Sequence, residues 1–203
     1  SICVSCRRFA SAMAAAYNSD LELQNVKTIA LGDIFTYHVN VSLDAEGNAY
    51  LGSSGIDAAQ QETFYVAAKY APGLAAELWA VNAPIELNWG RFFRLFSQAL
   101  PHGGMAFWST SQTGTALRRV SAGGGFSTAM AVDAWGDTLA VDVDGGIYLQ
   151  SGAPTGEMGL VKITAAGEHA WGSAILLGPI DHYLTQAMIG EGNKIYTTGI
   201  VSG

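Results

Sequence analysis

The sequence predicts an all-β fold, a β-propeller with about four blades of four strands each, or an arc of a larger propeller. Three observations predict it. A segment with Asp, Gly, Tyr, Leu and Ser at the same offsets occurs at Asp44–Ser53 and again at Asp142–Ser151. A shorter copy surrounds Tyr196, and the tyrosines fit a period of about 49 residues, which is typical of propeller blades. Runs of Val, Ile, Tyr and Thr between Asp-x-x-Gly and Pro-Gly turns indicate short antiparallel strands.

Each copy of the repeat predicts four strands. The third strand carries a basic residue, which is Lys69, Arg119 or Lys162 in successive copies. Trp79 and Trp171 share a place in the fourth strand, and the middle copy has no tryptophan there. Four antiparallel strands in a unit of about 40–50 residues are typical of a propeller blade. In the first complete copy the predicted strands are 37–44, 48–54, 63–70 and 76–82.

The two ends of the chain are predicted to share one blade of a single domain. The segment around Arg7 resembles the third strand of the first copy, and Tyr17 follows it at the spacing at which Trp79 follows Lys69. We therefore expect strand rather than helix for residues 10–17. Residues 21–36 fit the repeat least well and are an extra strand or an inserted connection. The alternative is a fragment of a longer propeller. The predicted units are 37–82, 88–131, 137–174, and 183–203 completed by 1–18.

Two of these units resemble the bacterial β-propeller repeat called the SBBP repeat. The first contains Gly47-Asn-Ala-Tyr50-Leu-Gly-Ser, then Tyr65-Val-Ala-Ala-Lys69-Tyr-Ala-Pro-Gly73 and Leu78-Trp79. The second contains Glu157-Met-Gly-Leu-Val-Lys162-Ile, then Gly167 and Trp171. The motifs of this repeat are structural, so the resemblance implies a fold and no activity. Because proteins with such repeats are mostly extracellular, cell-surface or assembly-associated, it implies an extracellular or virion-associated location.

Charge and composition exclude some partners. The net charge is −7, with 10 Lys+Arg against 17 Asp+Glu, and no basic stripe is present, so nucleic-acid binding is disfavoured. Charged residues make up 13% of the chain, against about 25% in average soluble domains. This low charge indicates either a surface covered by neighbouring subunits or a compact secreted domain rich in small residues. No apolar run is long enough to predict a transmembrane helix.

Motifs of catalysis and metal binding are missing. Cys3 and Cys6 form a C-x-x-C without the second ligand pair of a structural zinc site, so we interpret them as strand residues. The sequence has no nucleophile elbow, P-loop or metalloprotease motif. It therefore predicts no enzyme, no catalytic residue, no metal site and no cofactor. The turns that begin at Asp44, Asp133 and Asp142 could ligate calcium, but an aspartate there also caps the turn, which we favour.

The aromatic residues divide into repeated and unrepeated ones. Trp79 and Trp171 share a repeat position and are predicted to pack between blades. Trp89, Trp108 and Trp135 break the repeat and are the predicted ligand-binding residues. The predicted function is a non-catalytic structural or interaction module of a larger extracellular or virion assembly, such as a phage tail or fibre component, with other protein subunits as partners. The alternative is a lectin-like propeller that binds a cell-surface glycan.

Overall fold

The structure is a computed structural model, and the chain falls into two compact units, Ser1–Glu86 and Leu87–Gly203, which are described separately. In the described part of the chain, regular structure consists of β-strands and one short 3-10 helix, η1 (Pro72–Leu74). None of the helical structure there is long and apolar enough to cross a membrane. The structure describes residues 11–30, 34–57, 62–85, 94–111, 114–132, 139–152, 157–170, 175–179, 182–190 and 194–201.

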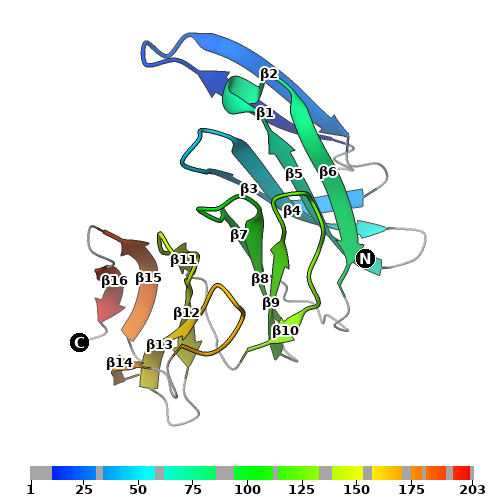
Figure 1. The fold of residues 1–203 in the computed structure, drawn as a ribbon. Helices are drawn as coiled ribbons and strands as arrows, with labels where there is room; N and C mark the ends of the chain where they lie inside the picture. Colours follow the sequence, from blue (N-terminus) through cyan, green and yellow to red (C-terminus); the bar gives the residue numbers. More distant parts are fainter. Residues whose placement is uncertain are drawn as a thin grey trace, which may run out of the picture. The chain divides into compact units, whose positions relative to one another are not determined.

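The first unit contains a four-stranded antiparallel sheet whose strands are neighbours in chain order (Figure 1). These strands overlap the four predicted from the first copy of the repeat, so that prediction is confirmed. A separate antiparallel hairpin precedes the sheet. The sheet consists of β3 (Ile34–Leu43), β4 (Ala49–Asp57), β5 (Glu62–Tyr70) and β6 (Glu77–Pro84), and the hairpin consists of β1 (Ser11–Tyr17) and β2 (Leu23–Ala30).

The second unit contains two more four-stranded antiparallel sheets and a hairpin. The first sheet comprises β7 (Arg94–Ala99), β8 (Met105–Ser111), β9 (Gly114–Val120) and β10 (Met130–Ala131). The second comprises β11 (Leu139–Val141), β12 (Ile147–Gly152), β13 (Glu157–Ile163) and β14 (Ile175–Pro179). The hairpin comprises β15 (His182–Ile189) and β16 (Ile195–Val201). The all-β prediction, with several small antiparallel sheets, is therefore confirmed.

Six of the turns in the described residues share one hydrogen-bond pattern. The backbone N–H of the first turn residue donates to the carbonyl four residues later, and its own carbonyl accepts from the N–H three residues later. The fourth residue has a positive φ, which glycine adopts without steric cost. The Asp-x-x-Gly signal of the sequence is therefore a three-residue hairpin loop that ends in a left-handed residue. The residues at this fourth position are Leu21, Gly47, Gly103, Gly124, Gly145 and Gly167.

Neighbouring sheets in the second unit pack face to face. Side chains alternate along a strand, so each sheet has two faces. One face of the β11–β14 sheet contains Ile147 and Leu149, and we call it and its counterpart in other sheets the apolar face. It packs against Trp108 and Leu117 of the preceding sheet. The opposite face contains Tyr148, and we call it the tyrosine face.

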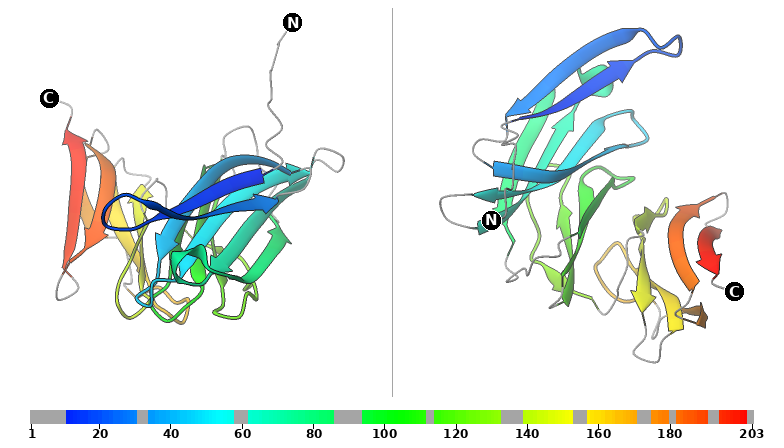
Figure 2. Two further views of the ribbon diagram at one scale, coloured as in Figure 1. Left: turned by 90° about the horizontal axis from the view of Figure 1, so that it is seen from above. Right: turned by 180° about the vertical axis from the view of Figure 1, so that it is seen from behind.

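The β15–β16 hairpin covers part of the tyrosine face of the β11–β14 sheet (Figure 2). Ile189 and Ile195 of the hairpin pack against Ala140 and Tyr148. In the first unit, Ala14 of the β1–β2 hairpin packs against the apolar face of the β3–β6 sheet. The apolar cluster there comprises Ala14, Ala49, Leu51, Ala68, Tyr70 and Leu74. The hydrophobic core therefore lies between stacked sheets in both units.

The N-terminal region is a hairpin, although its strands differ from the expected ones. Strand is observed for residues 11–17, as predicted, but Tyr17 ends β1, and the chain turns back into β2. Residues 23–30, for which an extra strand or a connection was expected, form that second strand. The segment around Arg7, on which the shared last blade depends, lies outside the described residues. The shared blade stays a prediction.

Candidate functional site

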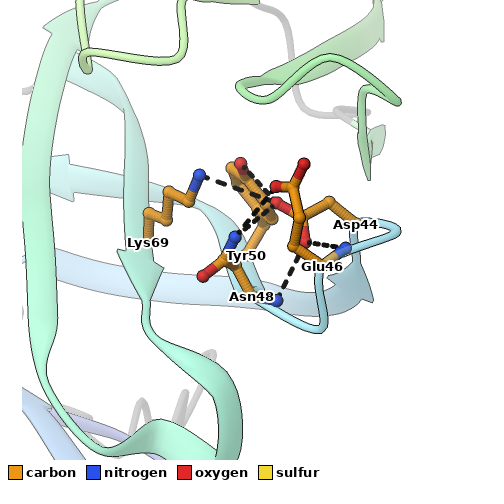
Figure 3. A network of polar contacts seen from close by, with 5 residues as sticks. All are labelled: Asp44, Glu46, Asn48, Tyr50 and Lys69. Carbon is orange, nitrogen blue, oxygen red and sulfur yellow. Dashed lines mark hydrogen bonds and ion pairs between the residues drawn. The ribbon is translucent and has the colours of Figure 1, made fainter.

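A buried polar cluster lies at the start of β4 (Figure 3). Asp44 is the first residue of the β3–β4 turn, and its Oδ1 accepts from the N–H groups of Glu46 at 3.1 Å and Asn48 at 2.9 Å. Its Oδ2 accepts from Asn48 Nδ2 at 2.8 Å and from the Tyr50 hydroxyl at 3.1 Å. Lys69 Nζ lies 3.6 Å from the same oxygen. The Asp44 side chain has no exposed surface, so this cluster both caps the turn and ties it to β5.

The same cluster recurs in the β11–β14 sheet. Asp142 Oδ1 accepts from the N–H groups of Asp144 at 3.1 Å and Gly146 at 2.6 Å. Its Oδ2 accepts from the Tyr148 hydroxyl at 3.1 Å and pairs with Lys162 Nζ at 2.8 Å. The capping role that the sequence favoured for the two aspartates is confirmed. The ion pairs with lysine were not predicted.

Strand register brings each cluster together. Tyr50 lies directly opposite Lys69 across β4 and β5, and Tyr148 lies opposite Lys162 across β12 and β13. Directly opposite residues have Cβ atoms about 5 Å apart on the same face of a sheet. Each lysine Nζ lies 4.9 Å from the centroid of its tyrosine ring, so the cation also interacts with the π-face.

One position distinguishes the two clusters. A Cβ on Gly146 would lie 2.6 Å from Asp142 Oδ2 and 2.8 Å from Lys162 Cε, so the close ion pair requires glycine there. Asn48 takes the corresponding turn position in the first unit, and its amide binds the carboxylate directly. The lysine of that cluster is correspondingly farther away, at 3.6 Å instead of 2.8 Å.

Electrostatics keep both clusters charged. Burial alone would raise the pKa of Asp44 and Asp142, but the hydrogen bonds they accept and the neighbouring lysines outweigh burial and lower both values. The hydrogen bonds of Lys162 to Asp142 and Tyr148 raise the pKa of that lysine. Burial would lower the pKa of Lys69, but Tyr50 and Asp44 raise it overall. Each cluster therefore contains a stable carboxylate–ammonium pair at neutral pH.

These pKa shifts predict how stability depends on pH. The lowered aspartate pKa values give a contribution to the free energy of unfolding that is present above about pH 4. This contribution is lost as pH falls through the folded-state pKa values. The raised lysine pKa values give a second contribution to the free energy of unfolding, which is complete below about pH 10.4. It is lost as pH rises through the folded-state pKa values. Urea unfolding between pH 2 and pH 11 should show both losses. A double variant, Asp44→Asn with Asp142→Asn, should flatten the acid limb, and an unchanged acid limb would contradict this assignment.

The middle sheet retains the turn but not the polar cluster. The turn that begins at Leu100 has the backbone hydrogen bonds of the Asp44 turn, so Leu100 takes the place of the aspartate. Ala106 takes the place of the tyrosine and lies opposite Arg119, which is the basic residue that the sequence aligned with the two lysines. The guanidinium of Arg119 donates to the carbonyl oxygens of Thr164 and Ala165, in the turn that follows β13 of the next sheet. In this sheet the basic residue therefore connects two sheets.

Removing the Arg119 guanidinium is expected to weaken this connection. The variant Arg119→Met keeps most of the aliphatic stem and should lower the free energy of unfolding by about 1.5–3 kcal/mol, the usual range for hydrogen bonds from a charged group. The control Lys194→Met removes the same charge at an exposed position and should change it by no more than about 0.5 kcal/mol. Chemical denaturation of both variants measures the difference. Equal effects would show that the contact contributes nothing.

The structure describes one of the three predicted ligand-binding tryptophans. Trp108 is fully buried, with 0% exposure, in the cluster between the two sheets of the second unit. Its place in the fold is that of a packing residue. Trp89 and Trp135 lie outside the described residues, so the ligand-binding prediction is untested for them. Trp79 lies opposite Lys69, and its ring and the Tyr50 ring are in a T-shaped arrangement at a centroid distance of 6.0 Å.

The charged groups of the two clusters are held by hydrogen bonds and ion pairs within the fold. Their carboxylates are buried and already hydrogen-bonded, and the lysines are held in ion pairs. Within the ranges that the structure describes, no three His, Cys, Asp or Glu side chains are grouped as metal ligands. What the clusters can do is hold the turn between the first two strands against the third strand. The sequence carried a signal for this, because Asp, Tyr and Lys occur together in two copies and the Asp and Tyr are both missing from the middle one.

Similarity to known proteins is found among solved structures. No protein-family model matches the chain. No curated protein matches it. The chain is similar to a protein of unknown function from Bacteroides caccae, with 13% sequence identity and a TM-score of 0.48. The match covers 92% of this chain and 64% of that one, so this chain spans less than two thirds of that structure's length. The SBBP resemblance therefore stays a prediction, and what is established is an all-β chain of several small antiparallel sheets.

Proposed function

We propose that this chain is a non-catalytic structural module that works through contact with other proteins in an extracellular or virion-associated assembly. We infer that each four-stranded sheet is one blade of a β-propeller, as the SBBP resemblance implies. Sheets of sequential antiparallel strands, joined by a repeated turn and stacked face to face in the second unit, support this inference. Because propellers have many functions, the function has to be argued from particular surfaces.

The observation that carries the proposal is an apolar face on the β1–β2 hairpin. Exposure alternates along β1, since Ala14 is buried whereas Met13 and Tyr17 are exposed. Tyr17 lies opposite Leu23, which is also exposed, and Val26 on the same face is exposed as well. An apolar face of this kind, on a chain in which only 13% of residues are charged, is typical of an interaction surface.

The polar clusters support a structural role. The repeat brings an aspartate and a lysine together in two sheets, and each pair fixes a turn. The pairs are Asp44 with Lys69 and Asp142 with Lys162. Hydrogen bonds and ion pairs of this kind rigidify a fold and select one strand register. A rigid repeat with an apolar outer face suits a protein that presents a surface to its partners.

Affinity capture with matched variants tests the proposal. The tagged chain is used as bait in extracts and medium of the organism that encodes it. Two variants accompany it, the double variant Met13→Ser with Tyr17→Ser, and the control Leu78→Ser, which removes an exposed apolar side chain outside the hairpin. We expect wild type and Leu78→Ser to enrich the same proteins and the double variant to lose them. A folded wild type that enriches no protein over the tag, while binding sugars on a glycan array, would reject the proposal for the lectin alternative.

A further inference from the structure

Another apolar surface lies on the edge strand of the first sheet. Val39, Val41 and Leu43 alternate along β3 and are 42%, 60% and 66% exposed. Their partners across the strand pair are Ser53, Leu51 and Ala49. Leu51 and Ala49 belong to the apolar face on which the β1–β2 hairpin packs. The exposed stripe on β3 is thus a continuation of an existing sheet-to-sheet interface.

The second unit shows what covers such a stripe. Val141 stands one residue before Asp142, as Leu43 stands one residue before Asp44, so the two positions correspond. Val141 packs against the cluster that contains Trp108 of the preceding sheet. In the middle sheet Ala106 takes the place of the tyrosine, so the face that contains Ala106 is the tyrosine face of that sheet. Trp108 and Arg119, the counterpart of the two cluster lysines, both lie on this face. The apolar face of one sheet is therefore covered by the tyrosine face of the sheet before it.

The chain also has a tyrosine face with its apolar side chains exposed. The turn from Gly190 to Lys194 has the backbone hydrogen bond of the Asp142 turn, which gives Tyr196 the position of Tyr148. Tyr196 lies directly opposite Met188 in the β15–β16 hairpin, and the two are 54% and 60% exposed. The hairpin's other face packs through Ile189 and Ile195 on the preceding sheet. The two surfaces that form this type of sheet-to-sheet interface, the apolar stripe on β3 and the tyrosine face of the β15–β16 hairpin, are therefore both exposed in the same chain.

We propose that these two halves join two copies of the chain, with the β15–β16 hairpin of one copy packed on the β3 stripe of the next. The proposal rests on the proposed function and names its partner as a second copy. Continuity with the β1–β2 interface supports a sheet as the occupant. The low charge of the chain, 13%, supports coverage by a neighbouring subunit. Because different patches meet, the contact is head to tail, and it builds a ring or a filament.

Directed disulfide formation tests the contact. In a background with Cys3→Ser and Cys6→Ser, one preparation has Leu43→Cys and another has Tyr196→Cys. Mixing the two under oxidation should give a disulfide-linked pair of chains, whereas Val143→Cys, at an exposed turn position of the second unit, should give little in place of Tyr196→Cys. The variant with both cysteines in one chain should form linked oligomers. If it forms only an internal disulfide, the second-copy proposal is wrong and the closed ring predicted from the sequence is favoured.

Sedimentation measures the strength of the same contact. We expect wild type to self-associate as concentration rises and Val41→Glu to weaken that association by about tenfold or more, because a carboxylate in an apolar interface is costly. The control Val143→Glu should self-associate like wild type, and melting curves should show that both variants are folded. A wild type that stays monomeric at every concentration overturns the inference. If it nevertheless captures other proteins through the β1–β2 face, the proposed function stands without it.

Discussion

Replacing Asp142 by alanine is expected to lower the free energy of unfolding by about 3–5 kcal/mol, the range for a buried ion pair that loses one partner. Asp142 accepts from the Gly146 N–H and the Tyr148 hydroxyl and pairs with Lys162 at 2.8 Å. Without the carboxylate, the lysine charge and the tyrosine hydroxyl lose their buried partner. Urea denaturation at pH 7 followed by circular dichroism measures the loss.

The matched control for this variant is Asp144→Ala. Asp144 belongs to the same turn, but its side chain is exposed, and its substitution removes the same charge. It should change the free energy of unfolding by no more than about 0.5 kcal/mol. Asp142→Asn should fall between the two, because it keeps an acceptor oxygen and loses the charge. If Asp142→Ala were as stable as Asp144→Ala, the cluster would not stabilise the sheet.

Replacing Trp108 by alanine is the second substitution with a large expected effect, about 3–5 kcal/mol of destabilisation. The indole is fully buried between the two sheets of the second unit, in contact with the cluster that includes Leu149 and Ile163. Its removal leaves a cavity that two stacked sheets can fill only in part. Thermal and chemical unfolding both measure the effect, and Trp108→Phe should recover much of the loss.

A control at an exposed apolar position separates burial from residue type. Val143 is 66% exposed, and Val143→Ala should change the free energy of unfolding by no more than about 0.5 kcal/mol. Loss of ligand binding in Trp108→Ala without loss of stability would count against the packing role.

The fold class could be read from the sequence because its signals are local. Alternating apolar residues give strands, and a glycine three residues after Asp44 or Asp142 gives the turn. Repetition of both signals at a steady period predicted the four strands of each sheet. The N-terminal hairpin was harder, since Leu21 stands where the other turns have glycine, and the turn signal is missing there.

The candidate site was only partly predictable, because its members come from different strands. Asp44 and Tyr50 are near each other in the chain, but Lys69 reaches them through the register of β4 and β5. In the middle sheet Leu100 stands in the place of the aspartate, so Arg119 has no carboxylate there to pair with. Its guanidinium extends to the next sheet instead. The sequence could not show this contact, because the carbonyls that Arg119 binds belong to a turn about 45 residues away.

The sequence by itself determined the strands, the turns and their repetition, because backbone preference and side-chain alternation act over a few residues. The tertiary structure alone decided which polar groups meet, which tryptophan is buried and which apolar stripes stay exposed. The physical reason is that strand register and sheet stacking set these distances, and both depend on residues that are far apart in the chain.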